Sequence, residues 1–219
     1  MQKRRYYMGK LILTSGGYLD GQRGKECDEI IETFSRNKKV LLVDNATLTG
    51  SNQKGVPIIK DNFSKIAKSV TQVSLTENNI KELEDYDVIY ITGGDLAPFF
   101  ELIQKCDLKG AFITYLKNGG IIIGESAGSM IFGVDLKWIY DVKKGTKPKY
   151  DIKLPSYKGL GIVNINFFPH WDKASDEMKE KVLSYEKEHH IKITRVQDNG
   201  FFVYDVHENT ITQDVVEIV

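Results

Sequence analysis

The first half of the chain alternates short apolar runs with stretches that carry apolar residues at helical spacing. Runs of four to six apolar residues between helices are typical of a parallel sheet that is covered by helices on both faces. Right-handed crossovers between such strands predict a doubly wound α/β fold with about five strand–helix units. The expected strands lie at residues 10–17, 38–47, 71–76, 85–94 and 120–126, and the expected helices lie at 24–37, 58–70, 78–85 and 96–120.

The second half of the chain has a different pattern. A strand is expected at 159–170 and a strong amphipathic helix at 175–190, after which three strand-like segments follow in quick succession with turn signals between them. This predicts an antiparallel extension at the end of the same sheet. The polar segment 141–158 is interpreted as a long loop, because too few residues follow it to form a second core. The whole chain, 1–219, is therefore expected to form a single domain.

Composition narrows the class of protein. Thirty basic and thirty acidic side chains cancel, so no long-range field attracts nucleic acid or an anionic membrane. The N-terminus lacks the apolar core of a secretory signal, and no stretch approaches the ~20 apolar residues that span a bilayer. Cys27 and Cys106 are isolated, which argues against a zinc site or a disulfide framework. We expect a cytoplasmic protein without nucleic-acid or membrane partners.

The segment 121–133, IIIGESAGSMIFG, contains the most informative motif. Its Gly124–Gly128 stretch matches G-x-S-x-G, and it lies between an expected strand and an apolar helix start. At such an elbow the nucleophile adopts a strained backbone conformation, so the residues beside it must be small. This context favours Ser126 as a nucleophile. The alternative is an ordinary strand-to-helix turn in which the serine only caps the helix.

An oxyanion hole needs two donors close to the developing charge. The backbone amide of Ala127, the residue after the serine, is one natural donor. The second could come from the glycine-rich segment 91–95, ITGGD, where a neighbouring strand ends at the same edge of the sheet. The alternative for this segment is a simple glycine turn.

The base of a serine hydrolase is expected to be a histidine. His170 ends the expected strand 159–170, so it would reach the edge of the sheet that carries Ser126. His189 and His190 close a charged helix, where the helix dipole explains them, and His207 lies in a polar turn. His170 is the preferred base, and a structural histidine after a proline is the alternative.

The orienting acid is left open by the residues themselves. Asp141 lies in the polar segment between Ser126 and His170, which could fold over the site. The competing carboxylates are Asp135, Asp172 and Glu125.

Taken together, ITGGD, GESAGS and GIVNINFFPHWD resemble the peptidase E family of serine peptidases, which also includes cyanophycinase. The resemblance covers about residues 10–215. It implies a flavodoxin-like fold, similar to that of the class I glutamine amidotransferases, with serine in place of cysteine at the elbow. Peptidase E proteins are cytoplasmic dipeptidases that remove an N-terminal aspartate.

The resemblance also implies residue roles. The nucleophile falls on Ser126, the base on His170 and the oxyanion donors on the backbone of Gly94 and Ala127. The acid of peptidase E lies 15 positions after its serine, which falls here on Asp141.

The chain departs from the family at several positions of the substrate site. Gly93 and Asp95 are expected to line that site, and Asp95 stands where the family usually has asparagine. Ser129 and Met130 replace the small residue and asparagine after the elbow, and the segment directly after His170, WDKASDEMKEK, contains no arginine. Asp95 would repel a substrate carboxylate unless a lysine neutralises it. The resemblance therefore supports the serine-peptidase chemistry of the family more strongly than its preference for an N-terminal aspartate.

We therefore expect a serine peptidase that hydrolyses short peptides, with or without a preference for an acidic first residue, through a Ser-His-Asp acyl-enzyme mechanism. This chemistry needs no metal or organic cofactor. One alternative is an esterase or amidase of the α/β-hydrolase type, and another is an inactive flavodoxin-like binding or regulatory protein. The oligomeric state, monomer or homodimer, is left open.

Overall fold

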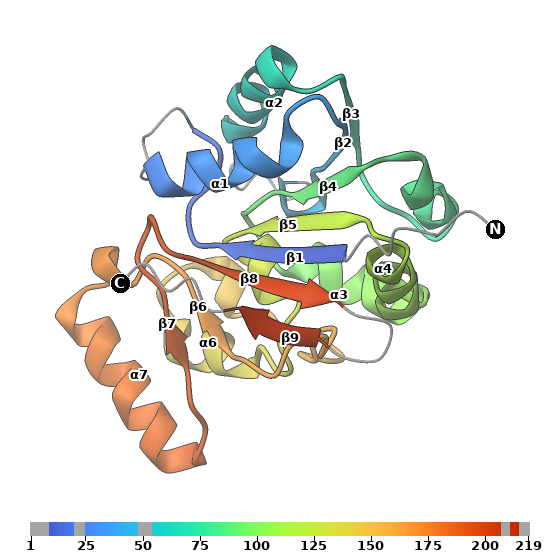
Figure 1. Ribbon diagram of the computed structural model, residues 1–219. Helices are drawn as coiled ribbons and strands as arrows, with labels where there is room; N and C mark the ends of the chain where they lie inside the picture. Colours follow the sequence, from blue (N-terminus) through green and yellow to red (C-terminus); the bar gives the residue numbers. More distant parts are fainter. Residues whose placement is uncertain (1–8, 20–24, 48–53, 207–210, 215–219) are drawn as a thin grey trace.

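The protein is built around a seven-stranded sheet (Figure 1). The computed structural model describes residues 9–19, 25–47, 54–206 and 211–214. In their order across the sheet, the strands are β3 (Ser69–Val73), β2 (Lys39–Val43), β4 (Val88–Ile91), β5 (Ile121–Glu125), β1 (Gly9–Thr14), β8 (Phe201–Val206) and β9 (Ile211–Asp214).

Strand direction divides this sheet into two parts. The first five strands across the sheet pair in parallel, from β3 to β1. β8 then pairs antiparallel with β1, and β9 pairs antiparallel with β8. The expectation of a mostly parallel α/β sheet with a C-terminal antiparallel extension is confirmed. Only two of the three strand-like segments expected in that extension belong to it, because the first of them pairs in parallel within a separate two-stranded sheet.

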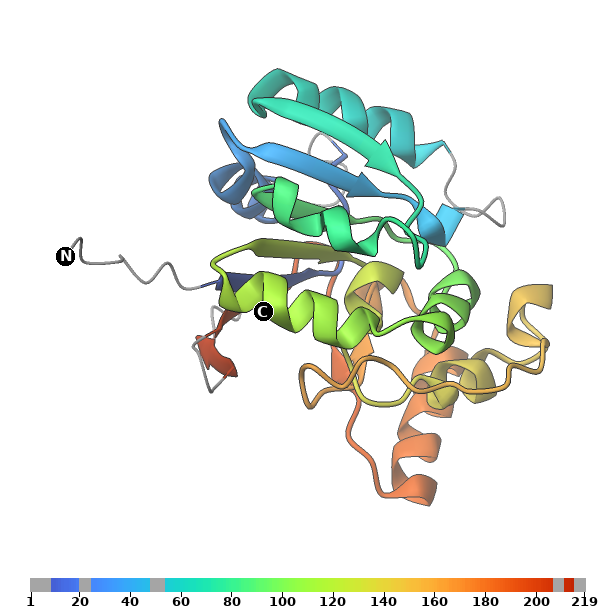
Figure 2. The ribbon, with the colours of Figure 1, turned by 90° about the vertical axis from the view of Figure 1, so that its right-hand side faces the viewer.

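Helices cover both faces of the sheet (Figures 1 and 2). Alternate residues of a strand point to opposite faces, so Ile12 packs in one core cluster while Leu11 and Leu13 pack in the other. The first cluster includes residues of α1 (Lys25–Ser35) and α2 (Gly55–Ile66). The second includes residues of α3 (Ala97–Lys105), α4 (Leu108–Lys117) and α5 (Ala127–Met130).

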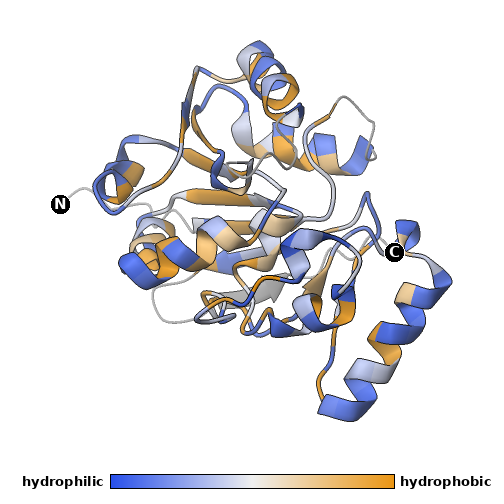
Figure 3. Cartoon of the chain, turned by 180° about the vertical axis from the view of Figure 1, so that it is seen from behind, coloured by the Kyte–Doolittle hydropathy of each residue, from blue (hydrophilic) through white to orange (hydrophobic). Residues whose placement is uncertain are grey.

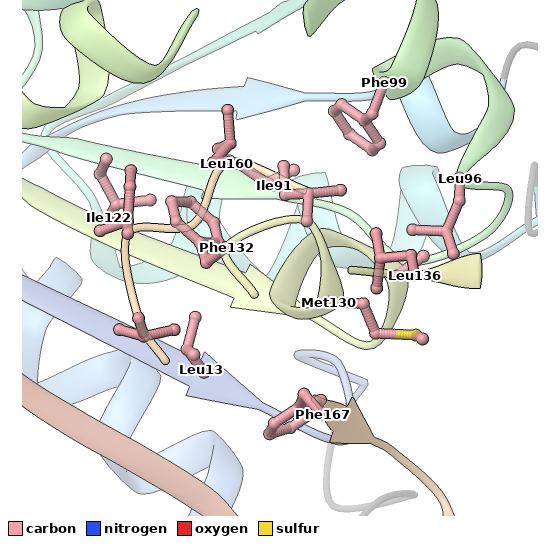
Figure 4. Close-up of a cluster of buried hydrophobic side chains, with 14 of the residues drawn as sticks. Leu13, Ile91, Leu96, Phe99, Ile122, Met130, Phe132, Leu136, Leu160 and Phe167 are labelled. Carbon is pink, nitrogen blue, oxygen red and sulfur yellow. The ribbon is translucent and has the colours of Figure 1, made fainter. Parts of the chain in front are cut away.

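The short helix α5 and the residues that follow it pack on the larger core cluster. Figure 4 shows side chains of Leu13, Ile91 and Ile122, from three neighbouring strands, gathered around Phe132 just beyond this helix. All four side chains are fully buried. The ring of Phe132 stacks on that of Phe112 in α4, with centroids 5.7 Å apart. The segment that follows the elbow is therefore fixed by packing on the sheet and on α4.

The segment expected as a strand at 159–170 is a strand only at its end. β6 (Phe167–Phe168) pairs in parallel with β7 (Thr194–Arg195) in a separate two-stranded sheet. Residues 159–163 instead donate backbone hydrogen bonds to residues 131–134, so this stretch packs beside the chain that leaves α5. Its apolar side chains are buried there, which explains the apolar pattern without a strand.

The segment 141–158, expected as a loop, begins within a helix. α6 (Lys137–Lys143) is followed by a short 3₁₀ turn, η3 (Pro148–Tyr150). The expected C-terminal helix is α7 (Asp176–His189), which is largely hydrophilic on the side seen in Figure 3. The remaining 3₁₀ turns are η1 (Asn45–Thr47), η2 (Ile80–Asp85) and η4 (Trp171–Lys173). No helix in the described ranges is long and apolar enough to cross a membrane.

Candidate active site

A pocket of about 650 Å³ lies where parallel strands of the sheet end. The loop after β4 contributes Gly93 and Gly94, and the end of β5 contributes Glu125, which Ser126 follows. The opposite walls come from α6 with the residues up to η3, and from the segment that leads from β6 to His170. The carboxyl ends of parallel strands are the usual position of a ligand site in an open α/β sheet.

Ser126 sits in a strained elbow between β5 and α5. Its φ of 50° and ψ of −109° lie outside the regions that most residues adopt. Its amide donates to the carbonyl of Thr14 at 2.9 Å, which ties the elbow to the end of β1. A side chain at Gly128 would have its Cβ 2.4 Å from the carbonyl oxygen of Ile91. The elbow therefore needs its small residues, as the motif predicts.

His170 meets this serine directly. Its Nε2 lies 2.9 Å from the Oγ of Ser126. The residue has a left-handed backbone conformation, with φ 60° and ψ 35°, which turns the chain sharply after β6. Its amide donates to the hydroxyl of Ser15 at 2.8 Å, so the turn is anchored to the end of β1. The structure thus brings together the two residues that the sequence analysis paired.

The partner of the other ring nitrogen is Asp198. Its Oδ1 contacts the Nδ1 of His170, and its side chain is only 9% exposed. Its own amide donates to Asp172 at 2.8 Å, and the Sγ of Cys27 lies 3.7 Å from its carbonyl oxygen. Asp198 is not among the carboxylates considered from the sequence, because it ends a strand-like segment at an Asn-Gly turn signal and no motif singles it out. The available signal was an aspartate three residues after the two-residue strand β7 (Thr194–Arg195).

Asp141, the acid expected from the family resemblance, lies elsewhere. Its carboxylate accepts hydrogen bonds from Lys137 and, at 3.0 Å, from the hydroxyl of Tyr185 in α7. Asp141 and Lys137 are four residues apart in α6, so they share one face of this helix. Asp141 lines a hollow between α6 and α7 and not the pocket that contains Ser126. This corrects the expectation: Asp198, and not Asp141, contacts His170.

The other carboxylates considered from the sequence have separate contacts. Asp135 accepts a hydrogen bond from the amide of Lys137 at the start of α6. Glu125 is buried and accepts a hydrogen bond from Tyr90 at 2.9 Å. Among the other histidines, His189 and His190 end α7. His207 lies outside the described residues.

Both expected oxyanion donors line the pocket. Gly94 has a φ of 145°, and a Cβ there would lie 2.3 Å from the carbonyl oxygen of Ala46. The amide of Ala127 begins α5, directly after the serine. Within the described part of the chain, neither amide donates a hydrogen bond to another protein group. Both can therefore serve a ligand.

The two residues expected to bind substrate also lie at the pocket. Gly93 packs against the elbow, since a Cβ there would come 3.0 Å from the Cβ of Ser126. Asp95 is only 5% exposed, and its carboxylate accepts a hydrogen bond from the amide of Ala97 at 3.0 Å. Asp95 therefore binds the first amide of α3 in addition to lining the pocket.

Three lysines form one wall of the pocket: Lys143, Lys147 and Lys149. Burial, together with the charges of Lys149 and Lys147, lowers the pKa of Lys143 to about 8. Its ammonium group lies over the rings of Tyr150 and Phe168, 5.4 and 5.3 Å from their centroids. Burial also lowers the pKa of Lys149, against the opposing effect of the Asp95 carboxylate. No motif in the sequence predicts that these lysines belong to the site.

The described residues contain no cluster of three or more His, Cys, Asp or Glu side chains that could hold a metal ion. What the site presents is a serine in contact with a histidine, a carboxylate behind that histidine, two amides and a basic wall. This set of groups is suited to acyl transfer to the serine.

Comparison with known proteins places the chain in a family, because residues 11–212 match peptidase family S51. The chain belongs to this family. The resemblance to peptidase E proteins that was drawn from the elbow and the Pro169-His170 segment is thereby confirmed.

Two curated relatives in the family have low sequence identity. Peptidase E of Shewanella denitrificans is 22% identical over 144 residues, which is 65% of this chain and 58% of the relative. An uncharacterized peptidase of Listeria monocytogenes serovar 1/2a is 28% identical over 107 residues, 47% of this chain and 49% of the relative. The chain spans about half the length of the curated relatives it matches.

Solved structures show the same fold. A crystal structure described as a candidate peptidase E protein from Listeria monocytogenes EGD-e has a TM-score of 0.69 at 20% identity, covering 96% of this chain and all of that one. A peptidase from an acI-B1 Actinobacterium has a TM-score of 0.62 at 16% identity, covering 95% of each chain.

Proposed function

We propose that this protein is a serine peptidase that hydrolyses short peptides through an acyl-enzyme intermediate. The observation that carries the proposal is the 2.9 Å contact between Ser126 Oγ and His170 Nε2 at a strained elbow, with the buried Asp198 behind the histidine. A nucleophile, a base and a group that orients the base, in mutual contact, make up the arrangement that activates a hydroxyl for attack. Membership of family S51 supports the same chemistry.

The reaction has two steps. His170 takes the hydroxyl proton as Ser126 attacks the peptide carbonyl, and the same histidine then protonates the leaving amine, which departs and leaves an ester on the serine. Water attacks this ester with His170 again as base, which releases the acid and restores the hydroxyl. Asp198 holds the tautomer with the proton on Nδ1 and stabilises the cationic ring. The amides of Gly94 and Ala127 bind the oxyanion in both steps.

The basic wall supports a preference for substrates with a carboxylate. Lys143, Lys147 and Lys149 face the pocket that contains the nucleophile, and Lys149 lies close enough to Asp95 for their charges to interact. The lysine neutralises the acidic residue that would otherwise repel a carboxylate. We therefore propose that peptides with an acidic first residue are preferred, with lysines in the role that the missing arginine would have had.

A dipeptide library with varied first residues, run beside p-nitrophenyl esters, tests this function. We expect cleavage of dipeptides, fastest for those that begin with aspartate or glutamate, and a loss of about 10⁶-fold in Ser126→Ala. Hydrolysis of esters without cleavage of any dipeptide would identify an esterase instead. A folded wild-type protein that hydrolyses neither class would point to a binding protein.

A further inference from the structure

The ammonium group of Lys149 contacts the backbone beside the nucleophile. Its Nζ donates a hydrogen bond to the carbonyl oxygen of Gly94 at 3.0 Å. Lys149 comes from η3, on the far wall of the pocket, and is 55 residues away in the sequence. This contact connects the basic wall to the loop that supplies one oxyanion donor.

The peptide group between Gly94 and Asp95 is held at both ends. Its carbonyl accepts the Lys149 hydrogen bond, and its N–H donates to the carbonyl of Ala46 at 2.8 Å. Two residues earlier in the sequence, the amide of Thr92 also fixes this loop, by donating a hydrogen bond to the carbonyl of Val43 at 3.0 Å. Between these anchors, the free N–H of Gly94 takes its direction from the φ of 145° that the anchors maintain.

Lys149 is itself held in place by its surroundings. It is only partly exposed, its Nζ lies 5.2 Å from the centroid of the Tyr150 ring, and the Asp95 carboxylate interacts with its charge. A lysine held by a ring and a carboxylate loses less conformational freedom when it binds the Gly94 carbonyl than a fully exposed lysine would. The hydrogen bond from a charged donor is also stronger than one between neutral groups.

We propose that Lys149 is a positioning residue for the oxyanion hole, which holds the Gly94 amide in the direction that a tetrahedral intermediate requires. This inference rests on the proposed function. It assigns Lys149 a role that does not depend on the charge of the substrate, which separates it from the two other lysines of the wall. Removal of the Lys149 side chain leaves the Gly94 amide in the chain, but the Gly94 carbonyl then loses the hydrogen bond that holds it.

The test uses an uncharged fluorophosphonate, because the phosphoryl oxygen of such a probe enters the oxyanion hole and the probe offers no carboxylate to the basic wall. We expect the rate constant for inactivation to fall about tenfold or more in Lys149→Met, a fraction of the 10²–10³-fold that loss of a whole donor costs. Lys149→Arg should recover most of the rate, since a guanidinium can also donate to the carbonyl. Lys144→Met is the matched control, because Lys144 is exposed and faces the hollow between α6 and α7.

Steady-state kinetics give the second readout. With an uncharged dipeptide, Lys149→Met should lower kcat while KM changes little, as expected when an interaction made only in the transition state is weakened. An unchanged kcat with a raised KM for acidic dipeptides alone would assign Lys149 to substrate binding and overturn the inference. Thermal unfolding of each variant shows whether the fold is intact.

The outcomes separate this inference from the function on which it rests. If the wild type and Lys149→Met are inactivated at equal rates, the positioning role is wrong and the proposed function stands. If the folded wild type neither reacts with the probe nor cleaves a dipeptide, the proposed function fails and takes the inference with it.

Discussion

The protonation state of Lys143 changes the positive charge of the pocket wall near neutral pH. Burial beside Lys147 and Lys149 lowers its pKa to about 8, although the rings of Tyr150 and Phe168 favour its charged form. Because the pKa is lowered, the ammonium form is present below about pH 8 and is lost as the pH rises through that value. The positive charge of the wall therefore weakens just above neutral pH.

We expect the KM for a dipeptide with an acidic first residue to rise between pH 7 and pH 9 in the wild type. In Lys143→Arg the rise should shrink, because a guanidinium stays charged throughout this range. Initial rates at several pH values, measured beside a dipeptide with an uncharged first residue, provide the check. An equal rise in KM for the uncharged dipeptide would show that the lysine does not sense the substrate carboxylate.

At the scale of elements, the site depends on how closely the loop after β4 approaches its neighbours. Gly94 combines a φ of 145° with a carbonyl oxygen of Ala46 only 2.3 Å from where a Cβ would lie. Gly145, between α6 and η3, also has a positive φ, of 76°, but has nothing within 4 Å of such a Cβ. Both glycines have a positive φ that would strain an L-residue, and they differ in how crowded a Cβ would be.

This difference predicts unequal effects on stability. Gly145→Ala should lower the free energy of unfolding by about 1–2 kcal/mol, the cost of placing an L-residue in a left-handed conformation. Gly94→Ala should lower the free energy of unfolding by roughly 1–3 kcal/mol more than Gly145→Ala does, because the loop must shift away from Ala46. Urea unfolding monitored by circular dichroism measures both. Equal losses in the two variants would show that the loop can relax without cost.

The elements also show what could be predicted from the sequence. The alternation of strands and helices and the elbow at Ser126 are local patterns, so they could be predicted, and the fold class is confirmed. The contact between Ser126 and His170 could be predicted because each residue lies in a motif at the end of an expected strand. The contact of His170 with Asp198 could not be predicted in the same way, because it depends on a two-stranded sheet, β6 with β7, whose strands are each two residues long.

The expectation for Asp141 failed for a related reason. The polar pattern predicts a loop that could fold over the site, but residues 137–143 form a helix that turns this carboxylate toward Lys137 and Tyr185. The spacing of four between Lys137 and Asp141 is a helical signal that was available in the sequence. The basic wall could not be assigned because three lysines in a charged segment are most often solvated.

At the scale of the whole molecule, β1 joins the two halves of the chain. It pairs in parallel with β5 on one side and antiparallel with β8 on the other, and Leu11, Ile12 and Leu13 are fully buried. The end of the same strand also anchors the site, since the Thr14 carbonyl holds the elbow and the Ser15 hydroxyl holds the His170 turn. Folding of the sheet and assembly of the site are therefore coupled.

We predict that the chain unfolds as one cooperative unit. Both tryptophans, Trp138 and Trp171, lie in the second half, so their fluorescence and the far-ultraviolet circular dichroism should report the same midpoint in urea. Leu13→Ala should lower the free energy of unfolding by about 2–5 kcal/mol and should shift both signals together. A fluorescence transition separate from that of circular dichroism would contradict a single domain.

Site-specific labelling with diisopropyl fluorophosphate tests whether Ser126, His170 and Asp198 act together. We predict that peptide mapping of the wild type finds the adduct on Ser126. The labelling rate should fall by about 10³–10⁴-fold in Asp198→Asn, the scale expected when the orienting acid is lost. It should stay unchanged in Asp141→Asn. An adduct elsewhere, or a rate that falls in Asp141→Asn and not in Asp198→Asn, would show that these three residues do not form the reactive unit.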